Sequence, residues 1–277
     1  MCIDCGCASS DEGHFHADHD HSHEHDGTSH DHGDHSTSSD RHATTRRISL
    51  EQDVLAVNNR MAAENRSFYQ EKRILPLNIL SSPGTGKTTL IEQTILALGR
   101  RSRAGRNSFP LAVIEGDQAT TRDSDRIRQL GIPAIQINTG KGCHLDADQI
   151  GHASRDLPLS PGMVLFIENI GNLVCPALFD LGESARVVLF SVTEGEDKPI
   201  KYPQMFGFAN LVLLTKTDLL PHLDFDRETA LNYIRAINPE ATILEVSSKS
   251  GDGLEEWIEW IDSLKKRVFD PVMTLDA

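Results

Sequence analysis

The sequence predicts an α/β domain with a doubly wound, mostly parallel sheet, preceded by a disordered histidine-rich tail. Two observations support this: seven short runs rich in Val, Ile and Leu alternate with helical stretches, and the first 42 residues hold few aliphatic side chains. Short apolar runs are typical of strands buried on both faces of a parallel sheet. Strands joined by crossover helices form a doubly wound sheet, which binds ligands beyond the carboxyl ends of its strands.

We divide the chain into a tail at residues 1–42, an N-terminal amphipathic helix at 43–73 and the α/β domain at 74–277. The tail holds ten of the 13 histidines and ten acidic residues against one arginine, so it carries most of the net charge of −14. Such a composition buries too little apolar area to offset chain entropy. No stripe of Lys and Arg is present, which argues against nucleic-acid binding.

The first residues lack the basic and apolar regions of a signal peptide, and no apolar run approaches the ~20 residues of a membrane span. We therefore expect a cytoplasmic protein with reduced thiols.

The donor groups of the tail indicate metal binding, since imidazole is the commonest metal ligand near neutral pH. The alternative is a merely solvated polar tract. Cys2, Cys5 and Cys7 can surround one cation, and these ligands suit both Ni(II) and Zn(II). Incidental thiols are the alternative there, although exposed thiols at a terminus are a liability. The expected auxiliary ligands are His14, His16, His19, His21, His23, His25, His30, His32 and His35.

The N-terminal helix is predicted because Leu50, Val54, Val57 and Met61 recur at spacings of three and four residues. A further helix is expected at Leu90–Leu98. The seven predicted strands are Ile74–Leu80, Leu111–Glu115, Ala134–Ile137, Met163–Glu168, Val187–Val192, Leu211–Thr215 and Thr242–Val246.

A phosphate-binding loop, Ser-Ser-Pro-Gly-Thr-Gly-Lys-Thr-Thr at residues 81–89, ends the first predicted strand. Its glycines let backbone N–H groups surround phosphate oxygens, and the following helix adds its dipole. We expect Lys87 to reach the β- and γ-phosphates and Thr88 to ligate Mg²⁺. Ser81 replaces the usual first glycine. The predicted phosphate-binding residues are Ser82, Pro83, Gly84, Thr85, Gly86, Lys87, Thr88 and Thr89.

Two acids at strand ends complete a candidate catalytic set with Lys87 and Thr88. Asp117 follows the second predicted strand and Glu168 ends the fourth. Each is expected to hold Mg²⁺, directly or through water, or to position the attacking water. An acid at a strand end is otherwise often a cap, so the phosphate-binding loop is what favours the catalytic interpretation.

Guanine is the predicted base, because Thr-Lys-Thr-Asp at residues 215–218 resembles the guanine-recognition motif of regulatory GTPases. The Asp218 carboxylate can accept hydrogen bonds from both N1–H and the N2 amine of guanine, a donor pair that adenine lacks. The stem of Lys216 can lie along the purine ring. Thr215 replaces the commoner Asn. A backbone contact to the guanine oxygen is expected from the segment that contains Ser247, Ser248 and Lys249.

A second candidate metal site combines Cys143 and His144, at a loop-to-helix junction, with Cys175. Two sulfur ligands and one nitrogen ligand suit zinc or nickel with an open coordination position. Spacing alone leaves the alternative of two buried structural cysteines and an unrelated histidine open.

These motifs together resemble those of the HypB family of hydrogenase nickel-incorporation GTPases, over residues 45–270 and the tail. The segments that carry the resemblance are Cys-Xaa-Xaa-Cys-Gly-Cys, the His-rich tract, the phosphate-binding loop, Glu-Gly-Asp, Gly-Cys-His-Leu-Asp, Glu-Asn-Ile-Gly-Asn-Leu-Val-Cys-Pro and Thr-Lys-Thr-Asp. The resemblance implies a P-loop NTPase of the SIMIBI type that binds GTP with Mg²⁺ and forms a homodimer. It also implies Ni(II) at Cys2, Cys5 and Cys7, and Zn(II) or Ni(II) at Cys143, His144 and Cys175.

The family further implies a slow GTPase that yields GDP and phosphate. With a small zinc-binding nickel chaperone as partner, it would pass nickel to the large subunit of a [NiFe]-hydrogenase. One alternative is a urease-type nickel GTPase, which is expected to use a Cys-Pro-His motif that this sequence lacks. The other is a nickel or zinc storage protein with a passive nucleotide domain.

Overall fold

The computed structural model describes residues 38–117, 122–140 and 142–270. The chain divides into two compact units, residues 1–55 and 56–277. The first helix, α1 (Ser38–Lys72), begins in the first unit, inside the segment assigned to the tail, and ends in the second.

A seven-stranded sheet forms the centre of the second unit, in the order β3-β2-β4-β1-β5-β6-β7. Every neighbouring pair of its strands is parallel. The seven predicted strands are confirmed, with ends that shift by at most two residues. They are β1 (Leu75–Ser81), β2 (Leu111–Asp117), β3 (Ala134–Asn138), β4 (Val164–Glu168), β5 (Ala185–Ser191), β6 (Leu211–Thr215) and β7 (Thr242–Val246).

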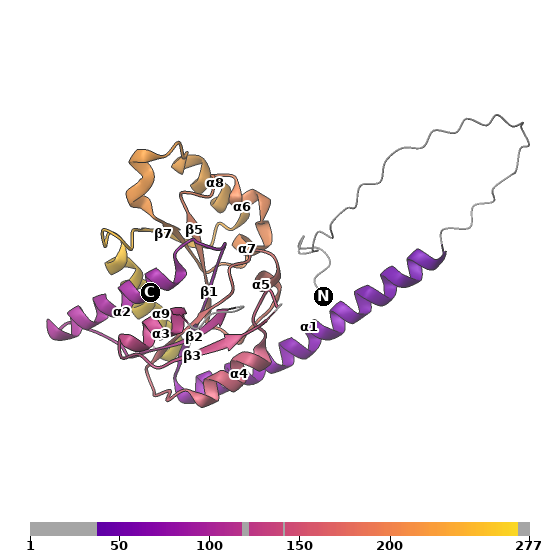
Figure 1. Cartoon of the computed structure of the whole chain (residues 1–277), viewed down its shortest axis with the longest axis horizontal. Helices are drawn as coiled ribbons and strands as arrows, with labels where there is room; N and C mark the ends of the chain where they lie inside the picture. The colour runs from indigo at the N-terminus through magenta and orange to yellow at the C-terminus, as the bar shows by residue number, and fades with distance from the viewer. Residues whose placement is uncertain (1–37, 118–121, 141, 271–277) are drawn as a thin grey trace, which may run out of the picture. The chain divides into compact units, whose positions relative to one another are not determined.

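Helices cover both faces of this sheet (Figure 1), as the doubly wound prediction requires. Leu77 and Ile79 of β1 pack with α2 and α9 on one face, while Leu80 faces the opposite core with β5, α7 and α8. The helices after α1 are α2 (Lys87–Arg103), α3 (Arg122–Gln129), α4 (Ala147–Asp156), α5 (Cys175–Leu178), α6 (Lys198–Lys201), α7 (Pro203–Gly207), the 3-10 helix η1 (Thr217–His222), α8 (Arg227–Ile237) and α9 (Leu254–Phe269). Within the described residues no helix has the length and apolar character that crossing a membrane requires.

The predicted N-terminal helix is present as α1, but its buried face does not follow the apolar pattern of the sequence. Val54 and Val57 are 51% and 50% exposed, whereas Asn58, Asn65 and Tyr69 are buried. The buried residues keep helical spacing, but their face is rotated by one position from the apolar pattern. The reason is that the two asparagines bind backbone groups of other loops, a tertiary contact that apolar periodicity cannot reveal.

Candidate functional site

The phosphate-binding loop joins β1 to α2 and has the geometry of an open cradle. Gly84 and Gly86 have φ values of 74° and 104°, and a Cβ atom added at either would meet no atom within 4 Å. Only glycine adopts such angles without strain, and the open space admits phosphate oxygens close to the backbone. Lys87 opens helix α2, and its Nζ donates to Ser81 Oγ at 3.0 Å. Ser81, in place of the usual glycine, thereby holds the lysine.

A cavity of about 520 Å³ lies beside this loop, and the four predicted catalytic residues line it: Lys87, Thr88, Asp117 and Glu168. Thr88 Oγ1 donates to Glu168 Oε1 at 2.7 Å. A hydroxyl and carboxylates are the hard oxygen ligands that Mg²⁺ prefers, so this donor set fits the ion. Sequence reasoning missed two further lining residues, Glu115 and Arg126. Glu115 belongs to the Glu-Gly-Asp segment, in which only Asp117 was assigned a role, and Arg126 falls in no motif.

The predicted guanine motif contacts the phosphate-binding loop directly. Thr215 Oγ1 donates to the carbonyl of Thr85 at 3.0 Å, and Lys216 Nζ donates to the carbonyl of Gly84 at 2.8 Å. Thr215 thus supplies a supporting hydrogen bond at the position where the motif commonly has Asn. Asp218 Oδ1 accepts a hydrogen bond from Ser247 Oγ at 2.7 Å. The two predicted base-binding segments therefore meet.

The remaining residues of the second base-binding segment are more exposed. Ser247 is buried, Ser248 is half-buried and Lys249 is exposed. The hydroxyl of Ser247 also accepts from the backbone N–H of Ser250 at 3.1 Å, which shapes the turn after β7. Ser247 therefore anchors this segment to Asp218.

Glu194, in the turn after β5, supports the phosphate-binding loop and was not found from the sequence. Its Oε2 accepts from Thr85 Oγ1 at 3.2 Å and from the backbone N–H of Ser191 at 2.9 Å. Lys198 forms an ion pair with its other oxygen. A glutamate in a turn between a strand and a short helix carries no motif, so only the fold identifies it.

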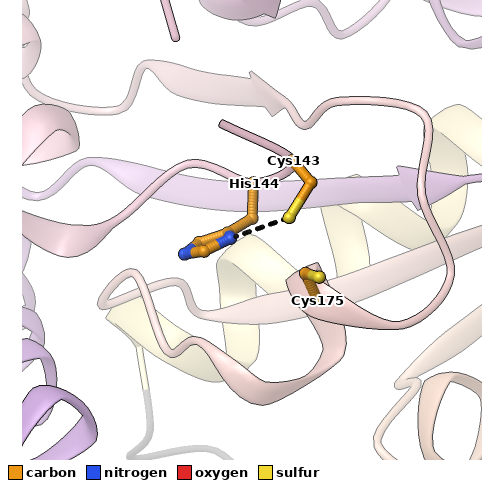
Figure 2. A group of neighbouring side chains, drawn as sticks. All are labelled: Cys143, His144 and Cys175. Atoms are coloured by element: carbon orange, nitrogen blue, oxygen red, sulfur yellow. Dashed lines mark hydrogen bonds between the residues drawn. The ribbon is translucent and has the colours of Figure 1, made fainter. Parts of the chain in front are cut away.

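The structure brings Cys143, His144 and Cys175 together (Figure 2), with one ligand atom of each within 4.8 Å of the others. Cys143 and His144 lie on the loop before α4, and Cys175 opens the short helix α5. Both cysteines are buried, and Cys143 Sγ lies 3.6 Å from His144 Nδ1. Two sulfurs and a ring nitrogen at this separation have the chemistry and spacing of a Zn(II) or Ni(II) site.

The ring of His144 is fixed by its neighbours. It stacks on Phe179 with 3.8 Å between ring centroids. Burial lowers the pKa of His144 below its usual range, which favours the neutral ring that binds metals.

Asn169 connects the Cys143–His144–Cys175 cluster with the phosphate cavity, and sequence reasoning did not single it out. Its Oδ1 accepts from the backbone N–H of Leu145 at 3.3 Å and from that of Ile170 at 3.0 Å. Leu145 follows the candidate ligand His144, while Glu168, which accepts a hydrogen bond from Thr88, precedes Asn169. One dipeptide therefore contacts both sites.

The same loop after β4 also packs against the phosphate-binding loop. A Cβ atom at Gly171 would lie 2.8 Å from Pro83 Cα, so glycine is needed for this close approach. The loop continues from Gly171 to the candidate ligand Cys175, so the segment in contact with the phosphate-binding loop is only a few residues from the Cys143–His144–Cys175 cluster.

The other predicted metal ligands, Cys2, Cys5, Cys7 and the tail histidines from His14 to His35, lie outside the described residues.

Comparison with known proteins gives matches over most of the chain. A family model described as the CobW/HypB/UreG nucleotide-binding domain matches residues 76–245. The hydrogenase maturation factor HypB of Azotobacter vinelandii is 56% identical over 218 residues, which span 79% of this chain and 70% of that protein. The protein of the same description from Escherichia coli K12 is 51% identical over 231 residues, spanning 83% of this chain and 77% of that protein.

Two solved structures share the fold and a substantial part of the sequence. The crystal structure of HypB from Helicobacter pylori in complex with nickel has a TM-score of 0.71 and 38% identity, over 76% of this chain and 96% of that one. HypB from Archaeoglobus fulgidus has a TM-score of 0.69 and 40% identity, over 76% of this chain and 100% of that one.

Proposed function

Since the chain belongs to the HypB family of hydrogenase maturation factors, we propose that it hydrolyses GTP to gate the insertion of Ni(II) into the large subunit of a [NiFe]-hydrogenase. In this proposal nickel is the cargo, held first by Cys2, Cys5 and Cys7 with the tail histidines and then by the cluster of Cys143, His144 and Cys175. Zn(II) is a second candidate for the cluster. The protein acts in the cytoplasm as a homodimer, with a small zinc-binding nickel chaperone as partner.

In this proposal, residues that line one cavity bind GTP and support its hydrolysis. Lys87 would bind the β- and γ-phosphates, Thr88 and Glu168 would hold Mg²⁺, and Asp117 would orient the attacking water. The chemistry that Mg²⁺ would supply there is neutralisation of the charge that develops on the transferred phosphoryl group. Asp218, oriented by Ser247, accepts the two guanine donors. These residues position the nucleotide and neutralise its phosphate charge, and we expect the turnover of GTP to be slow.

The observation that carries the proposal is the shared loop after β4. Glu168 contacts the Thr88 hydroxyl, and the next residue, Asn169, binds the backbone beside His144. A γ-phosphate that reorders this loop therefore also shifts the segment of Cys175 against the loop of Cys143 and His144. Ordering of such loops by a γ-phosphate is a common switching mode. A tenfold change in metal affinity requires only about 1.4 kcal/mol of differential binding.

Nickel titration of the full-length chain tests this coupling. Replacing Cys2, Cys5 and Cys7 by Ala leaves two of the five cysteines, Cys143 and Cys175. Thiolate-to-nickel charge-transfer absorption then reports on the cluster alone, because histidine ligands give no such band. We expect the nickel affinity to differ about tenfold between the GDP complex and the complex with a non-hydrolysable GTP analogue. Equal affinities in the two complexes would refute the coupling.

A storage protein with a passive nucleotide domain is distinguished in cells. Lys87→Ala removes the cation at the phosphates without touching a metal ligand. The proposed function expects loss of hydrogenase activity in this variant and at least partial rescue by excess nickel. A storage function predicts that the Lys87→Ala variant still delivers nickel.

A further inference from the structure

The two loops that carry the cluster ligands are both held by one helix that contributes no ligand. The loop of Cys143 and His144 runs into Ala147, the first residue of α4. The segment of Cys175 continues through Phe179 to Asp180 and Leu181. Ala147, Asp180 and Leu181 all form hydrogen bonds with buried side chains of helix α1. The α1 residues that take part belong to the second unit.

Asn58 binds the two loops at once. Its Oδ1 accepts from the backbone N–H of Ala147 at 2.9 Å, and its Nδ2 donates to the carbonyl of Asp180 at 2.8 Å. The side chain is 6% exposed. One amide therefore bridges the residue three positions after His144 and the residue directly after Phe179, whose ring stacks on His144.

Asn65 repeats this arrangement two turns further along the helix. Its Nδ2 donates to the carbonyl of Ala147 at 2.7 Å and to the carbonyl of Leu181 at 3.1 Å. Asn65 is 3% exposed, so the loss of either bond leaves a buried polar group without that partner. Two buried amides thus fix the same pair of loops.

The side chains of Asn58 and Asn65 lie in a tightly packed region, in which the neighbouring backbone has little room to move. A Cβ atom at Gly151 of α4 would lie 2.6 Å from Asn65 Oδ1, and one at Gly182 would lie 2.6 Å from the carbonyl of Ala62. Arg66 also forms an ion pair with Asp180, in which Nη2 donates to both carboxylate oxygens at 2.8 Å. Tight packing and directional bonds together determine how far apart the two loops lie.

We propose that helix α1 sets the separation of the two ligand-bearing loops, and that Asn58 and Asn65 are positioning residues of the Cys143–His144–Cys175 metal site. Neither asparagine touches the metal. They hold the apo cluster close to its ligating geometry, so that less ordering is required when the ion binds. Displacement of α1 from these loops then lowers metal affinity, which makes the helix a point of control over release. This inference rests on the proposed metal-binding function of the cluster.

The test uses the full-length chain with Cys2, Cys5 and Cys7 replaced by Ala and titrates it with nickel ions in the GDP complex. Asn58→Ala and Asn65→Ala are each expected to weaken binding roughly tenfold, as read from the charge-transfer band. The band is also expected to shift, because a changed loop separation changes the Ni–S geometry. A loss of fold alone would not alter the spectrum of the metal-bound form.

Tyr69→Phe is the matched control. Tyr69 lies on the same face of α1 and its hydroxyl shares a 2.7 Å hydrogen bond with Ser154 of α4, away from the ligand-bearing loops. We expect a lower thermal midpoint with unchanged nickel affinity and spectrum. The inference is overturned if the asparagine variants bind nickel as the parent does, or if Tyr69→Phe weakens binding equally. If the parent chain without Cys2, Cys5 and Cys7 shows no charge-transfer band with nickel, the proposed function of the cluster as a metal site is refuted instead.

Discussion

Replacing Asn169 by Ala should uncouple the nucleotide from the metal cluster while leaving both sets of ligands in place. The side chain is 1% exposed, and its Oδ1 accepts from the N–H groups of Leu145 and Ile170 while its Nδ2 donates to Asn78 Oδ1 at 3.3 Å. Alanine removes all three bonds. The bond to Leu145 is the one that reaches the loop of Cys143 and His144, so its loss should break the connection.

The expected magnitude follows from that bond. An ordinary hydrogen bond contributes about 1 kcal/mol net, and this one, at 3.3 Å, is longer than the usual N–H···O bond of about 2.9–3.0 Å, so we take about 1 kcal/mol as its upper value. That is close to the 1.4 kcal/mol that corresponds to a tenfold change in affinity. Asn169→Ala should therefore lower the ratio between the nickel affinities of the GTP-analogue complex and the GDP complex from about ten, with about two as the lower limit.

The assay is the charge-transfer titration of the full-length chain without Cys2, Cys5 and Cys7, in both nucleotide states. Asn238→Ala is the matched control, because Asn238 is also buried and donates to three backbone carbonyls, those of Phe206, Gly207 and Ala209. These contacts belong to the core beside α7 and α8, so this variant should keep the parent ratio. If Asn169→Ala keeps the parent's ratio of nickel affinities, the proposed coupling between nucleotide and metal through the end of β4 is refuted.

Three further outcomes can be measured directly. Asp218→Asn should weaken GTP binding by at least tenfold and improve binding of xanthosine triphosphate, since an amide can donate to the xanthine oxygen; equal GTP affinity would contradict the assigned base contact. Gly171→Ala should weaken nucleotide binding in a fluorescent-GDP assay, because the added methyl meets backbone atoms of Pro83. Burial raises the pKa of Tyr69 to about 12, above its ordinary value of 10.0. Stability from this group is therefore complete below pH 10 and lost between about pH 10 and 12, and thermal unfolding of Tyr69→Phe should lack that component.

The sheet and the nucleotide-binding motifs could be predicted because their signals are local. A run such as Leu211–Thr215 identifies a buried strand by itself, and the order of the strands brings the following loops to one edge. Glu194 and Asn58 could not be predicted, since each acts by binding groups that are distant in the chain. In α1 the apolar pattern of Val54 and Val57 even indicated the wrong face, because backbone groups of two loops, rather than apolar surface, select the buried residues.

The alternation of side chains along β4 explains why one strand can serve two sites. Successive residues of a strand point to opposite faces. Phe166 packs in the core with α2, and Glu168, two residues later, reaches Thr88 on that same face. Ile167 packs in the core with α4, and Asn169 reaches the N–H of Leu145 on that second face. Glu168 and Asn169 are adjacent in the chain, so a movement of the strand end on the phosphate side also displaces the contact beside His144. A single peptide unit therefore joins the residue that contacts Thr88 to the residue that contacts the loop of His144.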